Sequence, residues 1–350
     1  MTSRWRGLRC GGAEGVRTIA LLVGPPSIVH NAVSTVKTLA HVVSHGPHCL
    51  DGVAAAVAVA RYQAGRADVE TRFASNSEVD AVLRGLAPAP GRDHELWITD
   101  ISWREPETDA HLTRLARAGV RIYWIDHHRS ALERFRAGQV NVPFADLVVS
   151  EEYAASRLVY DYLARRLEAE GRSEPRFTAL GRLIEMADDN DRWLHRVPGS
   201  RELAGVVRVL GAEAYDDLLA IDAQLTYTPR MAAARDRVAA EIARSLAVAS
   251  ASRVERRVGD VTLVAAVCDG HPSEVADAWR KERRNAVFAL YDAKSLSVSL
   301  RRSPDCEVDL SRLASALGGG GHAAAAGAEL PELRTALAEA LAARVGERLP

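Results

Sequence analysis

The stretch VRIYWIDHH, residues 120–128, decides how the rest of the chain is interpreted. Its first part, Val120 to Ile125, is a mostly apolar run with the length of a buried strand. Asp126, His127 and His128 follow directly. A carboxylate and two imidazoles are costly at the end of a buried strand unless they bind something. The stretch therefore predicts a central strand with a ligand site at its end.

Length and composition fit a soluble globular protein with two domains. The chain has 350 residues, 47% of them hydrophobic and 26% charged. A formal net charge of −1 argues against a protein that coats long nucleic acid. The four cysteines form no CxxC pair, which favours the reducing cytoplasm over a disulfide framework. The apolar run Ile19 to Val23 is too short for a membrane span.

Apolar runs alternate with helical stretches in the first part of the chain. The predicted strands are His41 to Ser44, Val69 to Phe73, Glu95 to Thr99 and Val120 to Ile125. This alternation predicts an α/β fold with a parallel, doubly wound sheet. In such sheets ligands bind beyond the carboxyl ends of the strands. His45, Asp51 and Asp100 each lie at or just past such an end.

We expect four segments along the chain. Residues 1–38 are a partly disordered N-terminal extension, and residues 39–198 form the first α/β domain, which carries the site. Residues 199–253 are a helical linker, and residues 254–350 form a smaller α/β domain that binds substrate. The active-site cleft is expected between the two domains.

The polar groups near the strand ends, together with a later aspartate, form a carboxylate-rich set with two imidazoles. Oxygen ligands with a few nitrogens suit manganese or magnesium better than zinc, iron or cobalt. Asp100 could bridge two ions about 3.5–4 Å apart, which would clamp a phosphoryl group and acidify a water. Each group alone has an ordinary explanation as a turn or a helix cap. Their joint occurrence favours a metal-dependent phosphoesterase.

Several motifs carry a resemblance to a known family. Asp126-His127-His128 after an apolar strand, with His45, Asp51-Gly52 and residues 98–100 upstream, resembles the DHH phosphoesterases. Further segments resemble the family's C-terminal DHH-associated domain, and they span residues 298–301, 308–310, 319–322 and 325–327. The resemblance covers roughly residues 40–330 and is nearest to the oligoribonucleases that degrade very short RNA.

The resemblance implies a centre with two manganese ions. The metal ligands it gives are His45, Asp51, Asp100, His127 and Asp191, and Cys49 occupies a further ligand position. Asp188 and Asp189 are alternatives to Asp191, because the acidic cluster allows a shift in the match. Asp126 would not bind the metal itself but would orient an imidazole through a hydrogen bond.

The resemblance also implies catalytic and substrate-binding residues. Asp100 would be catalytic through its bridging role, and His128 would contact the scissile phosphate or leaving group as a proton donor. Arg301 would bind a phosphate with its planar guanidinium and is also counted as catalytic. Substrate would further contact a glycine-rich segment whose backbone amides can approach an anion, made of Gly319, Gly320, Gly321 and His322.

Cys49 departs from the family, which usually has an aspartate at this position. Beside a dication a thiol would ionise and could bind the ion, which favours Co²⁺, Zn²⁺ or Fe²⁺. Alternatively, Cys49 is a buried bystander next to a weak or empty site, and the neighbouring His48 could take its place. The tryptophans near the motifs are expected to pack in the core rather than to stack on bases: Trp97, Trp103, Trp124 and Trp193.

We therefore expect a metal-dependent phosphoesterase that hydrolyses short oligoribonucleotides or small nucleotides by a two-metal mechanism. A bisphosphonucleotide phosphatase and a phosphodiesterase for cyclic or linear dinucleotides are alternatives within the same chemistry. An alternative of another class is a catalytically impaired nucleotide-binding module. The expected partner is a short RNA or a small nucleotide, not a long duplex or a membrane, and a homodimer is left open.

Overall fold

The computed structural model describes residues 38–88 and 90–349. The expected N-terminal extension, residues 1–38, thus lies outside the described residues except for Thr38. The chain divides into two compact units between Arg235 and Asp236. Within the described residues, no helix is long and apolar enough to cross a membrane.

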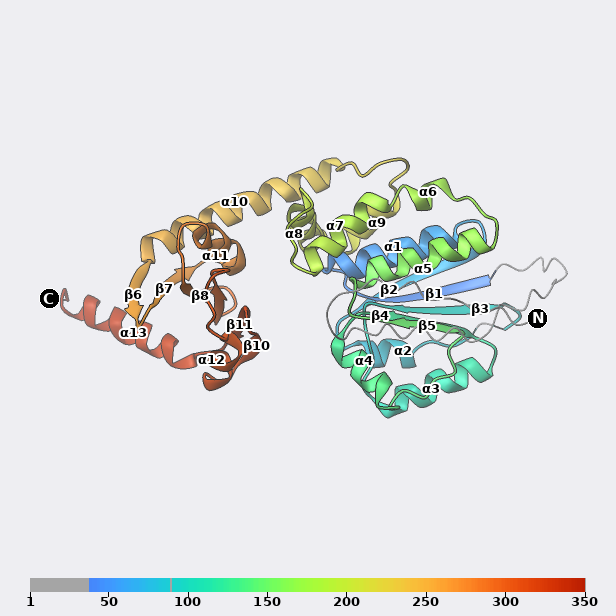
Figure 1. Ribbon diagram of the computed structural model, residues 1–350, viewed down its shortest axis with the longest axis horizontal. Helices are drawn as coiled ribbons and strands as arrows, with labels where there is room; N and C mark the ends of the chain where they lie inside the picture. The colour runs from blue at the N-terminus through green and yellow to red at the C-terminus, as the bar shows by residue number, and fades with distance from the viewer. Residues whose placement is uncertain (1–37, 89, 350) are drawn as a thin grey trace, which may run out of the picture. The chain divides into compact units, whose positions relative to one another are not determined.

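The first unit is built on a parallel sheet with helices on both faces (Figure 1). The strand order is β2-β1-β3-β4-β5, and every neighbouring pair is parallel. The strands are β1 (Thr38–His45), β2 (Ala67–Ala74), β3 (His94–Thr99), β4 (Arg121–Asp126) and β5 (Asp146–Val149). The predicted doubly wound α/β fold is confirmed.

Successive side chains of strand β4 point into opposite apolar layers, because the side chains of a pleated strand alternate between its two faces. Ile122 and Trp124 pack into one layer, whereas Tyr123 and Ile125 pack into the other. All four side chains are buried. A strand that is apolar on both faces is stable only inside a sheet covered on both sides. The sequence of β4 therefore fits an interior strand of a covered sheet, and the strand lies between β3 and β5.

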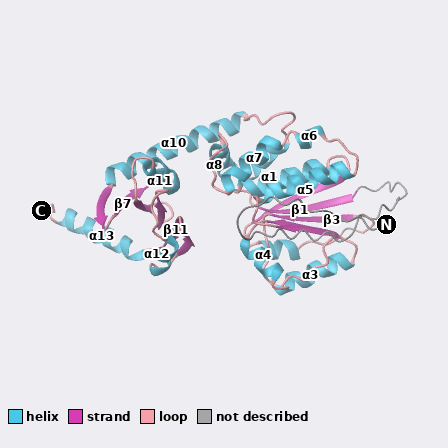
Figure 2. Ribbon diagram, in the orientation of Figure 1, coloured by secondary structure: helices cyan, strands magenta, loops and turns pink. Residues whose placement is uncertain are grey.

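Two groups of helices supply these layers, and Figure 2 shows them on opposite sides of the strands. One layer contains α1 (Leu50–Gln63), α5 (Ala155–Ala169), α6 (Pro175–Thr178), α7 (Gly181–Asp191), α8 (Ser200–Leu210) and α9 (Ala212–Leu219). The other contains α2 (Val79–Arg84), α3 (Pro106–Arg117) and α4 (Arg129–Arg136).

The segment expected as a helical linker, residues 199–253, differs from that expectation. Leu203 and Val206 of α8 and Leu218 of α9 are fully buried in the apolar layer of the first unit. Their burial makes α8 and α9 part of that unit's core. The remaining helix, α10 (Pro229–Ser252), runs across the division between the units.

The second unit contains a mostly antiparallel sheet with the order β10-β11-β9-β8-β7-β6. Only β7 and β8 pair in parallel within this sheet as described, and α11 (Pro272–Arg280) joins them. The strands are β6 (Val254–Val258), β7 (Val261–Cys268), β8 (Ala286–Asp292), β9 (Ser297–Arg302), β10 (Gly320–His322) and β11 (Ala325–Ala328). The later helices are α12 (Leu310–Ala316) and α13 (Pro331–Gly346).

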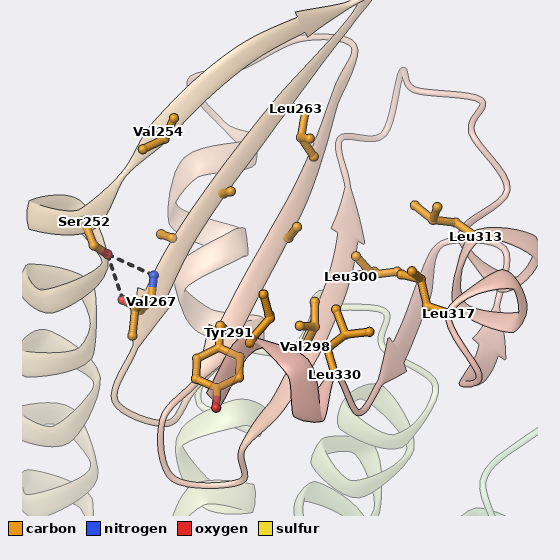
Figure 3. Close-up of a pocket in the computed structure, with 14 residues that line it drawn as sticks. Ser252, Val254, Leu263, Val267, Tyr291, Val298, Leu300, Leu313, Leu317 and Leu330 are labelled. Carbon is orange, nitrogen blue, oxygen red and sulfur yellow. Dashed lines mark hydrogen bonds between the residues drawn. The ribbon is translucent and has the colours of Figure 1, made fainter. Parts of the chain in front are cut away.

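An apolar groove of about 460 Å³ lies against the second sheet (Figure 3). Leu263, Tyr291 and Leu300 of the strands and Leu313 of α12 are among the residues that line it. No carboxylate, imidazole or cationic side chain is part of its lining. The groove therefore lacks the groups that phosphoester chemistry needs.

Candidate metal centre

The carboxyl ends of three neighbouring strands bring the predicted ligands together. Strand β1 ends at His45, β3 ends one residue before Asp100, and β4 ends one residue before His127. Because β1, β3 and β4 pair in parallel, these ends lie at one edge of the sheet. Helix α1 begins at the same edge and carries Asp51 in its first turn.

The start of α1 is tied closely to the strand ends. The Ser44 hydroxyl donates to the Gly52 carbonyl at 2.7 Å and accepts from the Thr99 hydroxyl at 2.9 Å. Gly52 is required at this point, since a Cβ there would lie 2.0 Å from the carbonyl oxygen of His45. The close approach of α1 to β1 therefore depends on a missing side chain.

Asp51 is held from across the fold by the N-terminus of α5. The backbone amides of Ala155 and Ser156 donate to its two carboxylate oxygens at 2.8 and 2.9 Å. A helix N-terminus stabilises such an anion. Burial nevertheless raises the pKa of Asp51 well above its usual value, and the nearby charges of Asp100 and Asp191 raise it further. The site thus concentrates negative charge away from water.

Asp100 lies between two groups of side chains. Its Oδ2 is 3.5 Å from His45 Nδ1 and 3.7 Å from Cys49 Sγ, and its Oδ1 is 3.4 Å from His127 Nε2. The residue adopts a left-handed backbone conformation, with φ of 57°. Such strain in a buried residue other than glycine is typical of functional sites. The contacts show that Oδ2 of Asp100 faces His45 and Cys49, whereas Oδ1 faces His127.

The side chains form sets in which the ligand atoms lie within 4.8 Å of one another. One set is His45, Cys49 and Asp100, and another is Asp51, His127 and Asp191. A third set joins Asp100 and His127 to His128. Because Asp100 occurs in two sets and His127 in two, the sets form one connected centre.

The distances fit ligands that share an ion. His127 Nε2 lies 3.4 Å from Asp100, 3.5 Å from Asp191 and 3.8 Å from Asp51. These distances are longer than the roughly 2.9 Å of a strong N–H···O hydrogen bond. Neighbouring ligand atoms about 2.1 Å from one ion lie about 3.0 Å apart at octahedral angles and about 3.4 Å apart at tetrahedral angles. The spacing is therefore that of donors around a cation.

The charges of the centre also fit a cation. Burial lowers the pKa of His127, but the hydrogen bond to Asp100 and the charges of Asp51 and Asp191 outweigh it and raise that pKa to about 10. Burial raises the pKa of Asp100, but hydrogen bonds with His127 and His45 lower it to about 2. The protonated imidazole thus supplies the positive charge that a bound metal ion would provide.

The acidic cluster 188–191 separates into three different roles. Asp188 accepts the backbone amide of Ala154 at 2.8 Å. Asp189 is buried and accepts the amides of Arg196 and Val197 at 2.6 and 3.1 Å. Asp191 alone of the three aspartates belongs to a ligand set of the described residues. The geometry therefore favours Asp191 over the two alternatives.

His128 is oriented by the residue at the end of β4. Its Nδ1 lies 2.7 Å from Asp126 Oδ1, and its backbone amide donates to the same oxygen at 3.0 Å. The Ser102 hydroxyl donates to the other oxygen of Asp126. The hydrogen bond with Asp126 raises the pKa of His128. His128 is therefore held in a fixed orientation at the exposed side of the centre.

Cys49 and His48 point to different partners. Cys49 is partly buried, and burial together with the charges of Asp100 and Asp51 raises the pKa of its thiol well above the usual value. The His48 ring instead donates to the backbone carbonyl of Arg208 at 2.9 Å. His48 is thus engaged with α8, while Cys49 faces the centre.

The predicted substrate-binding residues of the second unit lie together on its sheet. Arg301 of β9 is opposite Ala325 of β11, and Ala325 is opposite His322 of β10. Arg301 also donates to the Ser273 hydroxyl at 2.8 Å. Arg301 and His322 are therefore two strands apart, or roughly 10 Å.

The glycines before His322 have a structural reason of their own. A Cβ at Gly319 would lie 2.1 Å from the Gly327 carbonyl oxygen, and one at Gly321 would lie 2.6 Å from the Cα of Ala326. Gly320 faces open space. The close approach of this segment to β11 thus explains Gly319 and Gly321, and their binding of an anion stays a prediction.

The tryptophans near the motifs do not all behave as expected. Core packing is confirmed for Trp97, Trp103 and Trp124, which are fully buried. For Trp193 it is wrong, because 45% of that residue is exposed. Trp193 lies just after the end of α7, outside the helix whose apolar face packs in the core. The periodic pattern of that helix therefore does not extend to Trp193.

Comparisons with known proteins identify a matching domain and similar proteins. Residues 261–347 match the model of the DHHA1 domain. The chain is 27% identical over 305 residues to the oligoribonuclease NrnB of Bacillus subtilis strain 168. The aligned region covers 83% of this chain and 73% of that protein. It also resembles the solved structure of the pGpG-specific phosphodiesterase PggH from Vibrio cholerae. The TM-score is 0.51 at 13% identity, over 89% of this chain and 99% of that one, and at this identity the likeness concerns the fold.

Proposed function

Because the chain belongs to the DHH phosphoesterases, with a DHHA1 domain over residues 261–347, we propose that it hydrolyses the phosphoester bonds of short oligoribonucleotides with two divalent cations. The observation that carries this proposal is the place of Asp100. Its two oxygens face two different ligand sets, as a bridge between two ions requires.

The residues of the centre would divide between two ions. His45, Cys49 and Asp100 would hold one, and a second would lie among Asp51, Asp100, His127 and Asp191. Bound there, the ions would supply a positive clamp for phosphoryl oxygens and an acidified water. The amides of α5 keep Asp51 in place, and Asp126 keeps His128 in place. The carboxylate-rich donor set favours Mn²⁺.

Two residues would act on the substrate itself. His128 lies at the exposed side of the centre and would give its proton to the leaving oxygen, since the hydrogen bond with Asp126 raises its pKa and so favours the protonated ring. Arg301 would bind a phosphate, and Ser273 orients its guanidinium from one side. Gly319, Gly320, Gly321 and His322 would contact the same end of the substrate.

The likeness to an oligoribonuclease and the small net charge support a short substrate. A net charge of −1 provides little attraction for a long polyanion, so affinity must come from a few local contacts. We place the enzyme in the cytoplasm, where its free thiols at Cys49, Cys268 and Cys306 stay reduced.

A substrate panel tests the proposed function. The purified protein with Mn²⁺ is expected to release mononucleotides from a labelled RNA dinucleotide, and chelation of the metal should abolish the release. The panel also contains a bisphosphonucleotide and a cyclic dinucleotide, which test the two alternative activities. If no member is cleaved with manganese, cobalt or zinc while nucleotides still bind, the protein is a binding module.

Cys49→Asp tests whether the thiol binds the metal. A carboxylate is a harder donor than a thiolate. The ratio of activity with Mn²⁺ to activity with Zn²⁺ or Co²⁺ should rise about tenfold, the scale of changes in ligand environment. Cys306→Ala, in the core of the second unit, is the matched control and should leave the ratio unchanged. An unchanged ratio in Cys49→Asp would show that the thiol is a bystander.

A further inference from the structure

Trp193 has an unusual environment for a tryptophan. Among the tryptophans that the structure describes, Trp97, Trp103, Trp124 and Trp279 are buried, whereas Trp193 is 45% exposed. Exposing an indole to water forgoes a large hydrophobic gain. The residue follows Asp191, a predicted metal ligand, by two positions. A large apolar ring is therefore kept in solvent two residues along the chain from the proposed centre.

The backbone around Trp193 is strained and firmly held. Trp193 and His195 both adopt left-handed conformations, each with φ of 56°. Such conformations cost free energy in residues with side chains, and they persist where the surroundings enforce them, often in ligand clamps. Buried Asp189 supplies this constraint, because it accepts the amides of Arg196 and Val197 and the hydroxyl of Ser200. The exposure of the indole is thus built into the loop.

The indole ring is also oriented by its neighbours. The Arg201 guanidinium lies over it, 5.4 Å from the ring centroid, and the His195 ring meets it at 90° with centroids 4.6 Å apart. Such contacts fix an aromatic plane. Nearly half of Trp193 stays exposed despite them. Its free surface is therefore a preorganised aromatic platform.

The platform lies within reach of a substrate held at the centre. Asp191 and His128 are its exposed members, whereas Asp51 and Asp100 are buried, so a substrate must enter on the side of Asp191. Two residues of chain span at most about 7 Å between the Cα atoms of Asp191 and Trp193. A base and the phosphate of the same nucleotide are separated by a similar distance.

We propose that Trp193 forms the base-stacking surface of this enzyme, on which a nucleobase of the substrate lies while its phosphate is bound at the metal centre. The proposal rests on the function proposed above and adds a ligand contact to it. Stacking on an aromatic side chain accepts every base, because each has a π face. The enzyme would therefore cleave short RNA with little preference for sequence.

Kinetics of Trp193→Ala and Trp193→Phe, with the full chain and Mn²⁺, test this proposal. On the dinucleotide pApA, kcat/KM of Trp193→Ala should fall about 10- to 100-fold, mainly through KM, which is the scale of one lost stacking contact. Trp193→Phe keeps a π face and should lose far less. An abasic dinucleotide, which has nothing to stack, should be cleaved equally by all three proteins. Equal thermal midpoints would show that the variants are folded.

The opposite results are equally clear. Wild-type kcat/KM on pApA in Trp193→Ala overturns the proposal, as does an equal loss on the abasic dinucleotide, which would mean a disturbed metal centre. A titration with AMP in the presence of Mg²⁺ separates this proposal from the proposed function, because AMP has no internucleotide bond to cleave. If the wild type cleaves no dinucleotide, saturable quenching of its fluorescence that disappears in Trp193→Phe still supports the platform, and its absence overturns it.

Discussion

Asp100→Asn is expected to lose about a thousandfold or more of kcat, the scale seen when a group that stabilises the transition state is removed. In the proposed centre, Asp100 gives one oxygen to each ion. Asparagine keeps the shape but has no charge and only one oxygen, so it can serve one ion at most. Asparagine also tolerates the left-handed backbone that Asp100 adopts. The loss can thus be assigned to the carboxylate, and steady-state hydrolysis of a dinucleotide measures it.

Asp80→Asn is the matched control for this substitution. Asp80 is also a buried aspartate, and it accepts the backbone amides of Arg104 and Glu105, both at 3.1 Å, away from the ligand sets. Its loss should lower the free energy of unfolding and leave kcat of the folded protein near the wild-type value. Turnover by Asp100→Asn within tenfold of the wild type would refute the bridging role.

Gly52→Ala is expected to disrupt both the fold and the centre. The new methyl group would lie 2.0 Å from the carbonyl oxygen of His45 and 3.1 Å from Oδ2 of Asp100. The first of these is a backbone atom, so the start of α1 and the end of β1 must move apart. We expect the free energy of unfolding to fall by about 3 kcal/mol, as for a severely overpacked core. Manganese affinity should fall as well, because His45 and Asp100 are displaced.

Chemical denaturation and manganese titration measure these two effects. Gly181→Ala is the control, since Gly181 begins α7 and the nearest atom to its new Cβ would be 3.9 Å away. That change should be neutral or stabilise the protein by up to about 1 kcal/mol. Wild-type stability and metal affinity in Gly52→Ala would show that α1 is not fixed against β1 as described.

The fold could be predicted from local patterns because the sequence of a single strand, β4, indicates the type of sheet. The apolar residues of β4 are buried on both faces, and this alone indicates a covered, parallel sheet. In a parallel sheet the carboxyl ends of neighbouring strands meet, so His45, Asp100 and His127 could be grouped before their distances were known.

Other parts of the site depend on contacts that no local pattern reveals. Asp51 is held by two backbone amides of α5, more than a hundred residues away in the sequence. The small residues that carry these amides, Ala155 and Ser156, form no recognisable motif. The choice among Asp188, Asp189 and Asp191 required the helix phase, since each residue turns the side chain by about 100°. Burial of α8 and α9 required the surface of α1 and α7 to be known. The exposure of Trp193 depends on the loop that Asp189 anchors.

The positions of manganese in crystals of the wild-type protein test the central claim most directly. We predict two anomalous peaks about 3.5–4 Å apart, with Asp100 in contact with both. One peak should lie beside His45 and Cys49, and the other beside Asp51, His127 and Asp191. A single peak, or two peaks that Asp100 does not join, would contradict the account.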